Sequence, residues 1–364
     1  MKKCLVVIQN LSKSGSPQTF LHVIKTLKGI NFSVDLFAFS ILDDNDLYFL
    51  NSYEKLCDKI IFSRVKMNGI TYKLFPFLVF NKVKTKLRKN DYDLVLTNNI
   101  YFSAYCLKHK NKNLKSKIIY YSLGRLDIRS RFVLLRKKER YIKKQLSSID
   151  AFIALSSFTF LKDVPIPKEK QFVLMDYPNL FYPEIHKEYR NNGRPILRIG
   201  QIGYFCANKN QIFTLRVFEE IKKVNTEAEL YYMGYVFADE KKYYGDFLKE
   251  LSKSSVKGSV KMLPSDYDKK DFFQLVDVLV LPSHHEGLSL TLLEAQFSNT
   301  YCIASLNVPP DVEFGNCDRL PLLINEWVDL INEEKYKKIK NISNNYGQNE
   351  FSNKLRTIIE KTIK

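Results

Sequence analysis

Two glutamates stand eight residues apart around a glycine in the last third of the sequence. Glu286 immediately precedes Gly287, and Glu294 follows within an apolar stretch that predicts a helix over residues 288–297. A fully helical span of that length would rise about 12 Å, comparable to the reach from the sugar ring to the ribose of a nucleotide sugar. One carboxylate could then bind hydroxyl groups at each end of such a ligand. The alternative is a strand-loop-helix unit whose glutamates are merely solvated.

The predicted start of this helix has the features of an anion site. Gly287 allows the backbone to approach a ligand closely. The first-turn amides of Leu288, Ser289 and Leu290 should be unpaired, and a helix start with such donors suits a diphosphate.

Two histidines, His284 and His285, precede Glu286 and raise the question of a metal. Adjacent imidazoles rarely bind one ion, and the other three histidines fall in the first half of the chain or in the predicted linker. We therefore expect no metal, and we expect the pair to line a substrate or to be simple loop residues. Six scattered cysteines without a Cys-x-x-Cys pair predict reduced, mostly buried thiols.

Apolar strands alternate with helical patterns along the whole chain, which predicts parallel sheets with helices on both faces. The first helix has a clear start and stop, with Ser16 as a possible cap, Pro17 at the first helical position and Gly29 at the end. Strands are predicted at 4–9, 32–39, 93–97, 117–122, 151–156 and 172–175, and again at 196–202, 228–233, 260–263, 276–281 and 301–304.

The interruption between these two series predicts two doubly wound α/β domains. We expect an N-terminal Rossmann-like domain over 1–180, a linker over 181–195 and a C-terminal Rossmann-like domain over 196–348. A terminal helix over 349–364 is expected to pack back toward the N-terminal domain. Ligands of open α/β sheets bind beyond the carboxyl ends of the strands, so both domains would offer loops to a central cleft.

The run from Pro282 to Leu288, followed by Leu293-Glu294-Ala295-Gln296, resembles the signature of the family-4 retaining glycosyltransferases. It is especially similar to bacterial capsule, exopolysaccharide and O-antigen enzymes. Upstream, the segment 199–204 and Lys209-Asn210-Gln211 are similar to the family's phosphate-binding strand, loop and helix start. The resemblance is close in the C-terminal half and only in outline in the N-terminal half. It implies a GT-B fold, with two Rossmann-like domains facing a cleft. The N-terminal domain would bind the acceptor, and the C-terminal domain would bind the nucleotide sugar.

The resemblance also implies roles for individual residues. Glu286 would contact the donor sugar near its reacting carbon, and Glu294 would bind the ribose hydroxyls. Lys209 would neutralise the diphosphate, whose charge grows as it leaves. The remaining donor-binding candidates are Gly15 in the N-terminal domain and, in the C-terminal domain, Gly203, Tyr204, His285, Gly287, Leu288, Ser289 and Leu290. Transfer would retain the anomeric configuration and require no metal or cofactor.

One position departs from the family pattern. Members commonly carry an arginine directly after the glycine that Gly203 matches, and here that residue is Tyr204. A tyrosine can hydrogen-bond a phosphate but is uncharged at neutral pH. The substitution leaves open a catalytically weak or inactive protein that acts as a scaffold. A nucleotide-sugar epimerase on a related scaffold is a further alternative.

The net charge of +18 suggests an anionic partner. Basic residues alternate with apolar ones over 125–146, a pattern typical of segments that lie on anionic lipid. The alternative is a solvated basic face, and no motif supports nucleic-acid binding. Neither a signal peptide nor an apolar run long enough to cross a bilayer is found. We therefore expect a cytoplasmic protein, peripheral at the inner face of the membrane, with a nucleotide-sugar donor and a lipid-linked or oligosaccharide acceptor.

Overall fold

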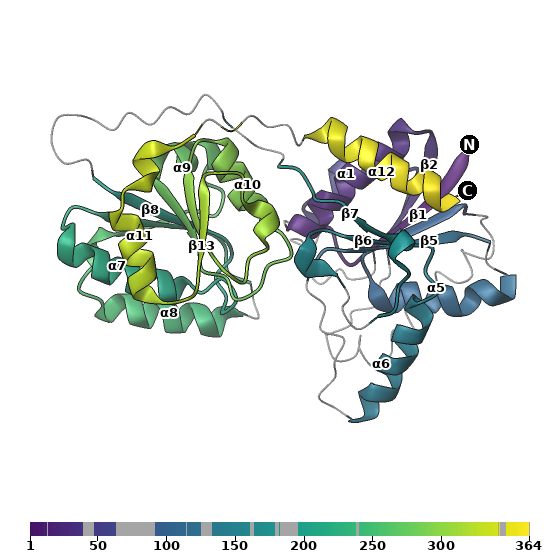
Figure 1. Ribbon diagram of the computed structural model, residues 1–364, viewed down its shortest axis with the longest axis horizontal. Helices are drawn as coiled ribbons and strands as arrows, with labels where there is room; N and C mark the ends of the chain where they lie inside the picture. Colours follow the sequence, from purple (N-terminus) through teal and green to yellow (C-terminus); the bar gives the residue numbers. More distant parts are fainter. Residues whose placement is uncertain are drawn as a thin grey trace. The chain divides into compact units, whose positions relative to one another are not determined.

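The computed structural model describes residues 1–12, 14–38, 47–62, 92–113, 115–124, 133–160, 164–178, 182, 196–237, 240–340, 342 and 347–363. The described chain forms two units (Figure 1). The first comprises Met1–Asp176 together with Tyr346–Lys364, and the second comprises Tyr177–Asn345. Apart from Tyr182, the linker predicted over 181–195 lies outside the described residues. We describe each unit separately.

The first unit is built on a seven-stranded parallel sheet with the order β3-β2-β1-β4-β5-β6-β7. Helices α1 and α12 lie on one face of this sheet, and α5 and α6 on the other (Figure 1). The strands are β1 (Lys2–Ile8), β2 (Phe32–Ala38), β3 (Lys59–Phe62), β4 (Leu94–Thr97), β5 (Lys117–Ser122), β6 (Ala151–Ala154) and β7 (Gln171–Val173). The helices are α1 (Gly15–Gly29), α2 (Leu50–Glu54), α5 (Ile100–Asn113), α6 (Val133–Leu146) and α12 (Gln348–Ile363).

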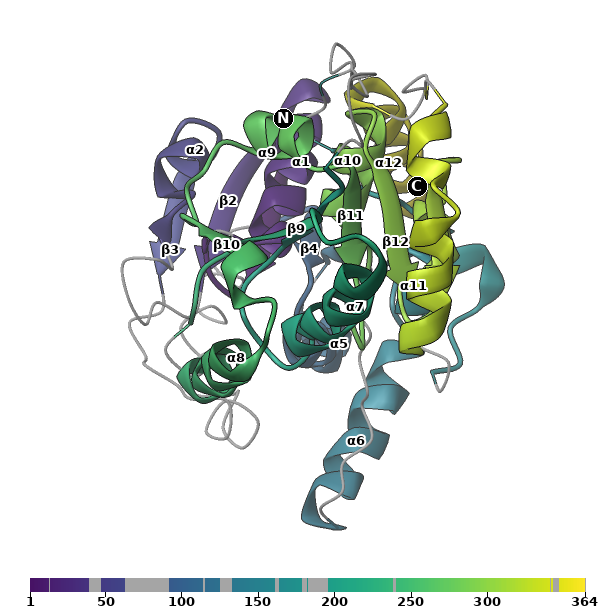
Figure 2. The ribbon, with the colours of Figure 1, turned by 90° about the vertical axis from the view of Figure 1, so that its left-hand side faces the viewer.

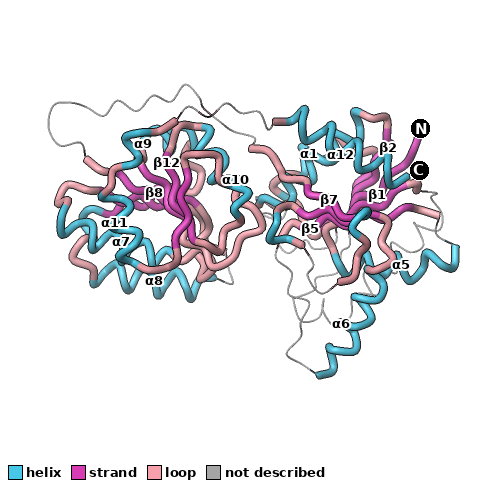
Figure 3. Tube along the Cα trace, in the orientation of Figure 1, coloured by secondary structure: helices cyan, strands magenta, loops and turns pink. Residues whose placement is uncertain are grey.

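The second unit has a six-stranded parallel sheet with the order β10-β9-β8-β11-β12-β13, again flanked by helices (Figure 3). Its strands are β8 (Arg198–Ile202), β9 (Glu229–Met233), β10 (Val260–Leu263), β11 (Val278–Leu281), β12 (Tyr301–Ser305) and β13 (Cys317–Leu320). Its helices are α7 (Gln211–Val224), α8 (Lys241–Lys253), α9 (Lys269–Leu275), α10 (Leu290–Phe297) and α11 (Ile324–Asn332).

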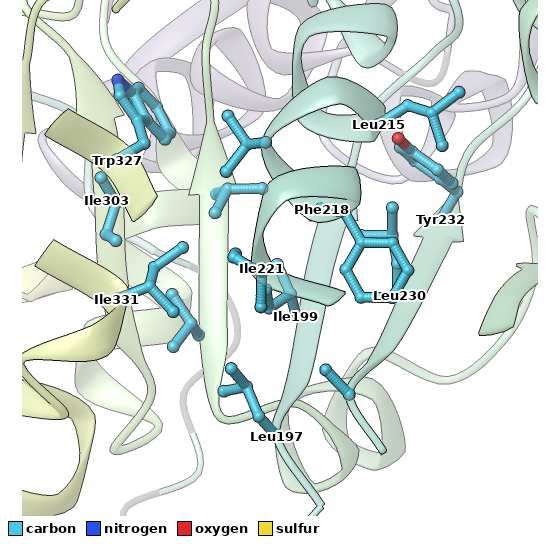
Figure 4. Close-up of a cluster of buried hydrophobic side chains, with 14 of the residues drawn as sticks. Leu197, Ile199, Leu215, Phe218, Ile221, Leu230, Tyr232, Ile303, Trp327 and Ile331 are labelled. Atoms are coloured by element: carbon cyan, nitrogen blue, oxygen red, sulfur yellow. The ribbon is translucent and has the colours of Figure 1, made fainter. Parts of the chain in front are cut away.

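The core of the second unit lies between its sheet and helices α7, α8 and α11. Phe218 and Ile221 of α7 pack over Ile199 of β8, and the buried Trp327 of α11 lies beside Ile303 of β12 (Figure 4). Burial of such side chains contributes about 1.5–3 kcal/mol each. This packing fixes the strand ends from which the loops of the site emerge.

The predicted class, two Rossmann-like doubly wound domains, is confirmed, and the structure adds two strands that the sequence patterns did not indicate. These are the edge strands β3 and β13, both short and only partly buried. The first helix also begins earlier than predicted, with Ser14 rather than Ser16 as its N-cap residue. The Ser16 hydroxyl instead accepts a hydrogen bond from the side-chain amide of Asn98 at 2.6 Å. Ser16 therefore connects α1 to the residue that follows β4.

Helix α1 holds the chain at both places where it crosses between the units. Asp176, the last residue before the second unit, is fully buried. Its carboxylate accepts a hydrogen bond from the Thr19 hydroxyl at 2.5 Å and lies 2.7 Å from Nδ1 of His22. On the return, Ser352 of α12 lies 3.0 Å from Thr26, and Phe351 packs edge-on against the His22 ring. The last helix is therefore an integral part of the first unit.

No helix in the described part of the chain has the length and apolar composition needed to cross a membrane.

Candidate active site

Two glycines bring the ends of β8 and β9 into close contact. Gly203 follows β8 with a φ of +149°, and its amide donates to the carbonyl of Met233 at 2.9 Å. A Cβ atom on Gly234 would lie 1.9 Å from the Gly203 oxygen, so a side chain there would force the two strand ends apart. These glycines set the path of the loop that follows β8.

This loop is tied to the loop that follows β11. The His284 amide donates to the Asn208 carbonyl at 2.8 Å, and the Asn208 side chain donates to the His285 carbonyl at 2.9 Å. The Gln201 side chain donates to the Lys209 carbonyl at 2.7 Å. The backbone at Lys209 is therefore fixed in two ways. The buried Gln201 binds the Lys209 carbonyl, and the neighbouring Asn208 is bonded to the loop that carries Glu286.

Lys209 and Glu286 meet in an ion pair, with Nζ 2.6 Å from Oε1, although they are 77 residues apart in sequence. Their side chains are 15% and 11% exposed, so water screens the pair only in part. The structure thus brings together the two residues that the sequence analysis singled out for catalysis. A cation and a carboxylate side by side can bind a phosphate and a sugar hydroxyl of one ligand.

Tyr204 lies against this pair. Its ring centroid is 6.0 Å from Lys209 Nζ and is packed against the rings of Tyr235 and Phe237. Burial, reinforced by Cys206 and Glu286, raises the pKa of Tyr204 well above its ordinary value. The phenol is therefore neutral at physiological pH, and its ring supports the ammonium group of Lys209 through a cation–π contact.

The start of α10 supplies backbone donors. The helix begins at Leu290, two residues later than predicted, and the Ser289 hydroxyl caps it by accepting from the Leu292 amide at 3.4 Å. Within the described residues, the amides of Leu288, Ser289 and Leu290 have no hydrogen-bond acceptor. Gly287 and Leu288 join these amides directly to Glu286.

Glu294 is fully enclosed in α10 and is not solvated. Its side chain is 2% exposed, and Oε2 lies 2.6 Å from Nζ of Lys269, the first residue of α9. No sequence pattern indicated Lys269, because the contact joins two helices whose packing is visible only in three dimensions.

The other predicted site residues lie in loops and at helix starts. His284 and His285 are exposed in the loop before Glu286. In the described part of the chain, no three His, Cys, Asp or Glu side chains are grouped so that they could hold a metal ion. Gly15 is the first residue of α1 and belongs to the first unit. Of the basic segment 125–146, the part over 125–132 lies outside the described residues, and the rest forms α6.

Residues 194–331 match the family described as glycosyl transferases group 1. The capsular polysaccharide biosynthesis glycosyltransferase CapH of Staphylococcus aureus is 23% identical over 303 residues, which cover 80% of this chain and 81% of CapH.

Solved structures show the same fold. Anabaena HepE in complex with UDP superimposes with a TM-score of 0.71 at 15% identity, covering 99% of this chain and 95% of that one. HepE in complex with UDP-glucose gives a TM-score of 0.70 at 15% identity, covering 100% and 98%. The protein therefore has the GT-B fold. The family match within the second unit and the similarity to CapH indicate a glycosyltransferase.

Proposed function

We propose that the protein transfers a sugar from a nucleoside-diphosphate sugar to a lipid-linked or oligosaccharide acceptor in the synthesis of a bacterial surface polysaccharide, with retention at the anomeric carbon. The ion pair between Lys209 and Glu286 beside the free amides of α10 carries this proposal. The similarity to CapH supports the polysaccharide, and the nucleotide complexes of HepE support the donor class.

The leaving diphosphate would be bound by Lys209 and by the amides of Leu288, Ser289 and Leu290. None of these amides has an acceptor among the described residues. They lie at a helix start, where the dipole favours an anion. Charge accumulates on the diphosphate as the glycosidic bond breaks, so donors already in place stabilise the transition state more than the ground state.

Glu286 would act on the sugar. As the anomeric carbon acquires oxocarbenium character, a carboxylate beside the ring stabilises the positive charge. Its contact with Lys209 keeps it oriented until the donor binds. In same-face displacement the departing phosphate takes the acceptor proton, and Glu286 need not form a covalent bond.

A panel of nucleotide sugars tests this function. We expect one donor among UDP-, GDP-, ADP-, CDP- and dTDP-sugars to raise the melting temperature and to be slowly hydrolysed. The anomeric configuration of the released or transferred sugar, followed by proton NMR, should match that of the donor. Inversion would contradict the retaining mechanism, epimerisation without an acceptor would indicate an epimerase, and the absence of binding to every donor would favour a scaffold.

We further propose that α6 brings the enzyme to the cytoplasmic face of a membrane. The helix extends away from the sheet of its unit, with its first turns farthest out (Figures 1 and 2). Arg140 and Lys144 are exposed, whereas Ile142 and Leu146 are buried against the unit. Lysines and arginines near an anionic surface contribute about 1 kcal/mol each to binding, which would place the site near a lipid-linked acceptor.

Sedimentation with liposomes tests this placement. The protein should bind vesicles that contain anionic lipid and should bind neutral vesicles much less. Replacing Arg140, Lys143 and Lys144 by glutamine should reduce binding, whereas the same change at Lys241, Lys242 and Lys249 of α8 should not. Equal binding to both kinds of vesicle would contradict the proposed role of α6 in membrane binding.

A further inference from the structure

We propose that Lys269 is a positioning residue that holds the Glu294 carboxylate in place for the ribose hydroxyls of the donor. The inference rests on the proposed function, in which Glu294 binds that ribose. It assigns a role to a lysine that no motif indicates, on a helix that carries none of the other site residues.

Lys269 and Glu294 are in close contact, but they differ in exposure to solvent. Lys269 Nζ lies 2.6 Å from Glu294 Oε2, yet the glutamate side chain is 2% exposed and the lysine side chain 30% exposed. A buried carboxylate is costly unless it is paired and hydrogen-bonded. Lys269 therefore supplies a positively charged partner for the buried Glu294 carboxylate, while its own side chain remains partly exposed.

The helix that carries Lys269 is firmly anchored. Asp268 caps α9 by accepting from the amides of Lys270 at 2.7 Å and Asp271 at 3.2 Å. Phe272 and Phe273 in the next turn are fully buried. Lys269 thus stands at a fixed helix start and can hold a side chain of α10 in one orientation.

Neutralisation of Glu294 also serves the nearby anion site. Glu294 lies in α10, whose first amides would bind the diphosphate. An unpaired carboxylate about one turn away would repel that diphosphate. Paired with Lys269, Glu294 can accept hydrogen bonds from neutral hydroxyls without placing a net negative charge beside the phosphates.

The test measures how well the protein distinguishes ribose from deoxyribose. Calorimetric titration first identifies which of UDP, GDP, ADP and CDP binds most tightly. Its 2′-deoxy and 3′-deoxy counterparts are then titrated. Hydrogen bonds to a charged group are the stronger ones, so the wild type should prefer the ribonucleotide over at least one deoxy form by about tenfold or more.

In Lys269→Met, the affinity for the ribonucleotide should fall about tenfold and the preference over the deoxy form should shrink to within about threefold. Lys269→Arg should restore most of the preference, because it keeps the charge. Lys241→Met removes the same cation from the first position of α8 and should change neither value. Glu294→Gln should lose the preference as Lys269→Met does, and the double variant should be no worse than either single one.

The outcomes separate this inference from the function on which it rests. If the wild type binds none of the four nucleotides, the proposed donor site is wrong. If it binds but does not distinguish ribose from deoxyribose, the ribose role of Glu294 and the role of Lys269 both fail while donor binding stands. If Lys269→Met or Lys269→Gln, folded by circular dichroism, weakens the ribonucleotide and its deoxy form equally, Lys269 acts only through charge or stability and the inference is overturned.

Discussion

Two lysine–glutamate pairs, Lys209–Glu286 and Lys269–Glu294, have the same length and different settings. Both nitrogen–oxygen distances are 2.6 Å. Lys209 and Glu286 lie on two loops and are 15% and 11% exposed, whereas Glu294 lies in a helix and is 2% exposed beside a lysine at another helix start. Loops can rearrange as bonds break, and packed helices hold one geometry. This difference suits the first pair to the part of the donor whose bonds change, the sugar and the diphosphate. It suits the second pair to the ribose, which does not react.

The most direct way to break this comparison is Glu286→Gln. Loss of the carboxylate beside the reacting carbon should lower kcat about 10³-fold, with the nucleotide affinity changed much less. The same change at the other end, Glu294→Gln, should raise KM and leave kcat within about threefold, as expected for uniform binding. Steady-state kinetics with the identified donor measure both. Equal loss of kcat in the two variants would show that the pairs do not differ in role.

Lys209→Met tests the cation of the loop pair. We expect kcat to fall about 10²-fold, because the diphosphate gains charge in the transition state and loses its compact counter-charge. Lys209→Arg should recover part of the rate, and Lys223→Met on α7, where Lys223 pairs only with the exposed Glu220, serves as the control. A change confined to KM would place Lys209 with the ribose end of the site.

Gly234→Ala tests whether the loop pair depends on the two strand ends. The added Cβ would lie 1.9 Å from the Gly203 oxygen, so the backbone must move. We expect the free energy of unfolding to fall by about 2 kcal/mol and the catalytic rate to fall with it. Calorimetry and kinetics measure the two effects. Gly245→Ala in α8, where an added Cβ meets nothing within 4 Å, is the matched control. Unchanged stability in Gly234→Ala would contradict the close approach.

Tyr204→Phe should have the smallest effect. The ring, which supports Lys209, is kept, and only a neutral hydroxyl is lost, so the rate should change less than about threefold. Because burial raises the pKa of Tyr204, the phenol keeps its proton below pH 10 and even beyond. The pH profiles of wild type and Tyr204→Phe should therefore coincide between pH 6 and pH 10. If the wild-type pH–rate profile falls or rises at one end of this range and the profile of Tyr204→Phe does not, Tyr204 ionises during the reaction.

Much of this site could be predicted from the sequence, because it depends on local patterns. Buried parallel strands are continuous apolar runs, and Glu286, Gly287 and Glu294 form one contiguous motif. The partners of these residues could not be predicted equally well. Lys209 followed only from a resemblance, and Lys269 had no signal, since its contact with Glu294 depends on how α9 and α10 pack. The edge strands β3 and β13 were missed because each has only four residues, which is too short to show a clear period.

Helix α12 has a consequence for how the protein is made. The second unit is one continuous stretch of chain, Tyr177–Asn345, and its sheet can assemble as soon as that stretch has been synthesised. The first unit must wait until Phe351 and Ser352 have also been synthesised, because these residues contact His22 and Thr26 of α1. The usual order of assembly, in which the N-terminal domain folds first, is thus reversed. A chain that stops before residue 347 would lack α12 and leave this face of α1 exposed.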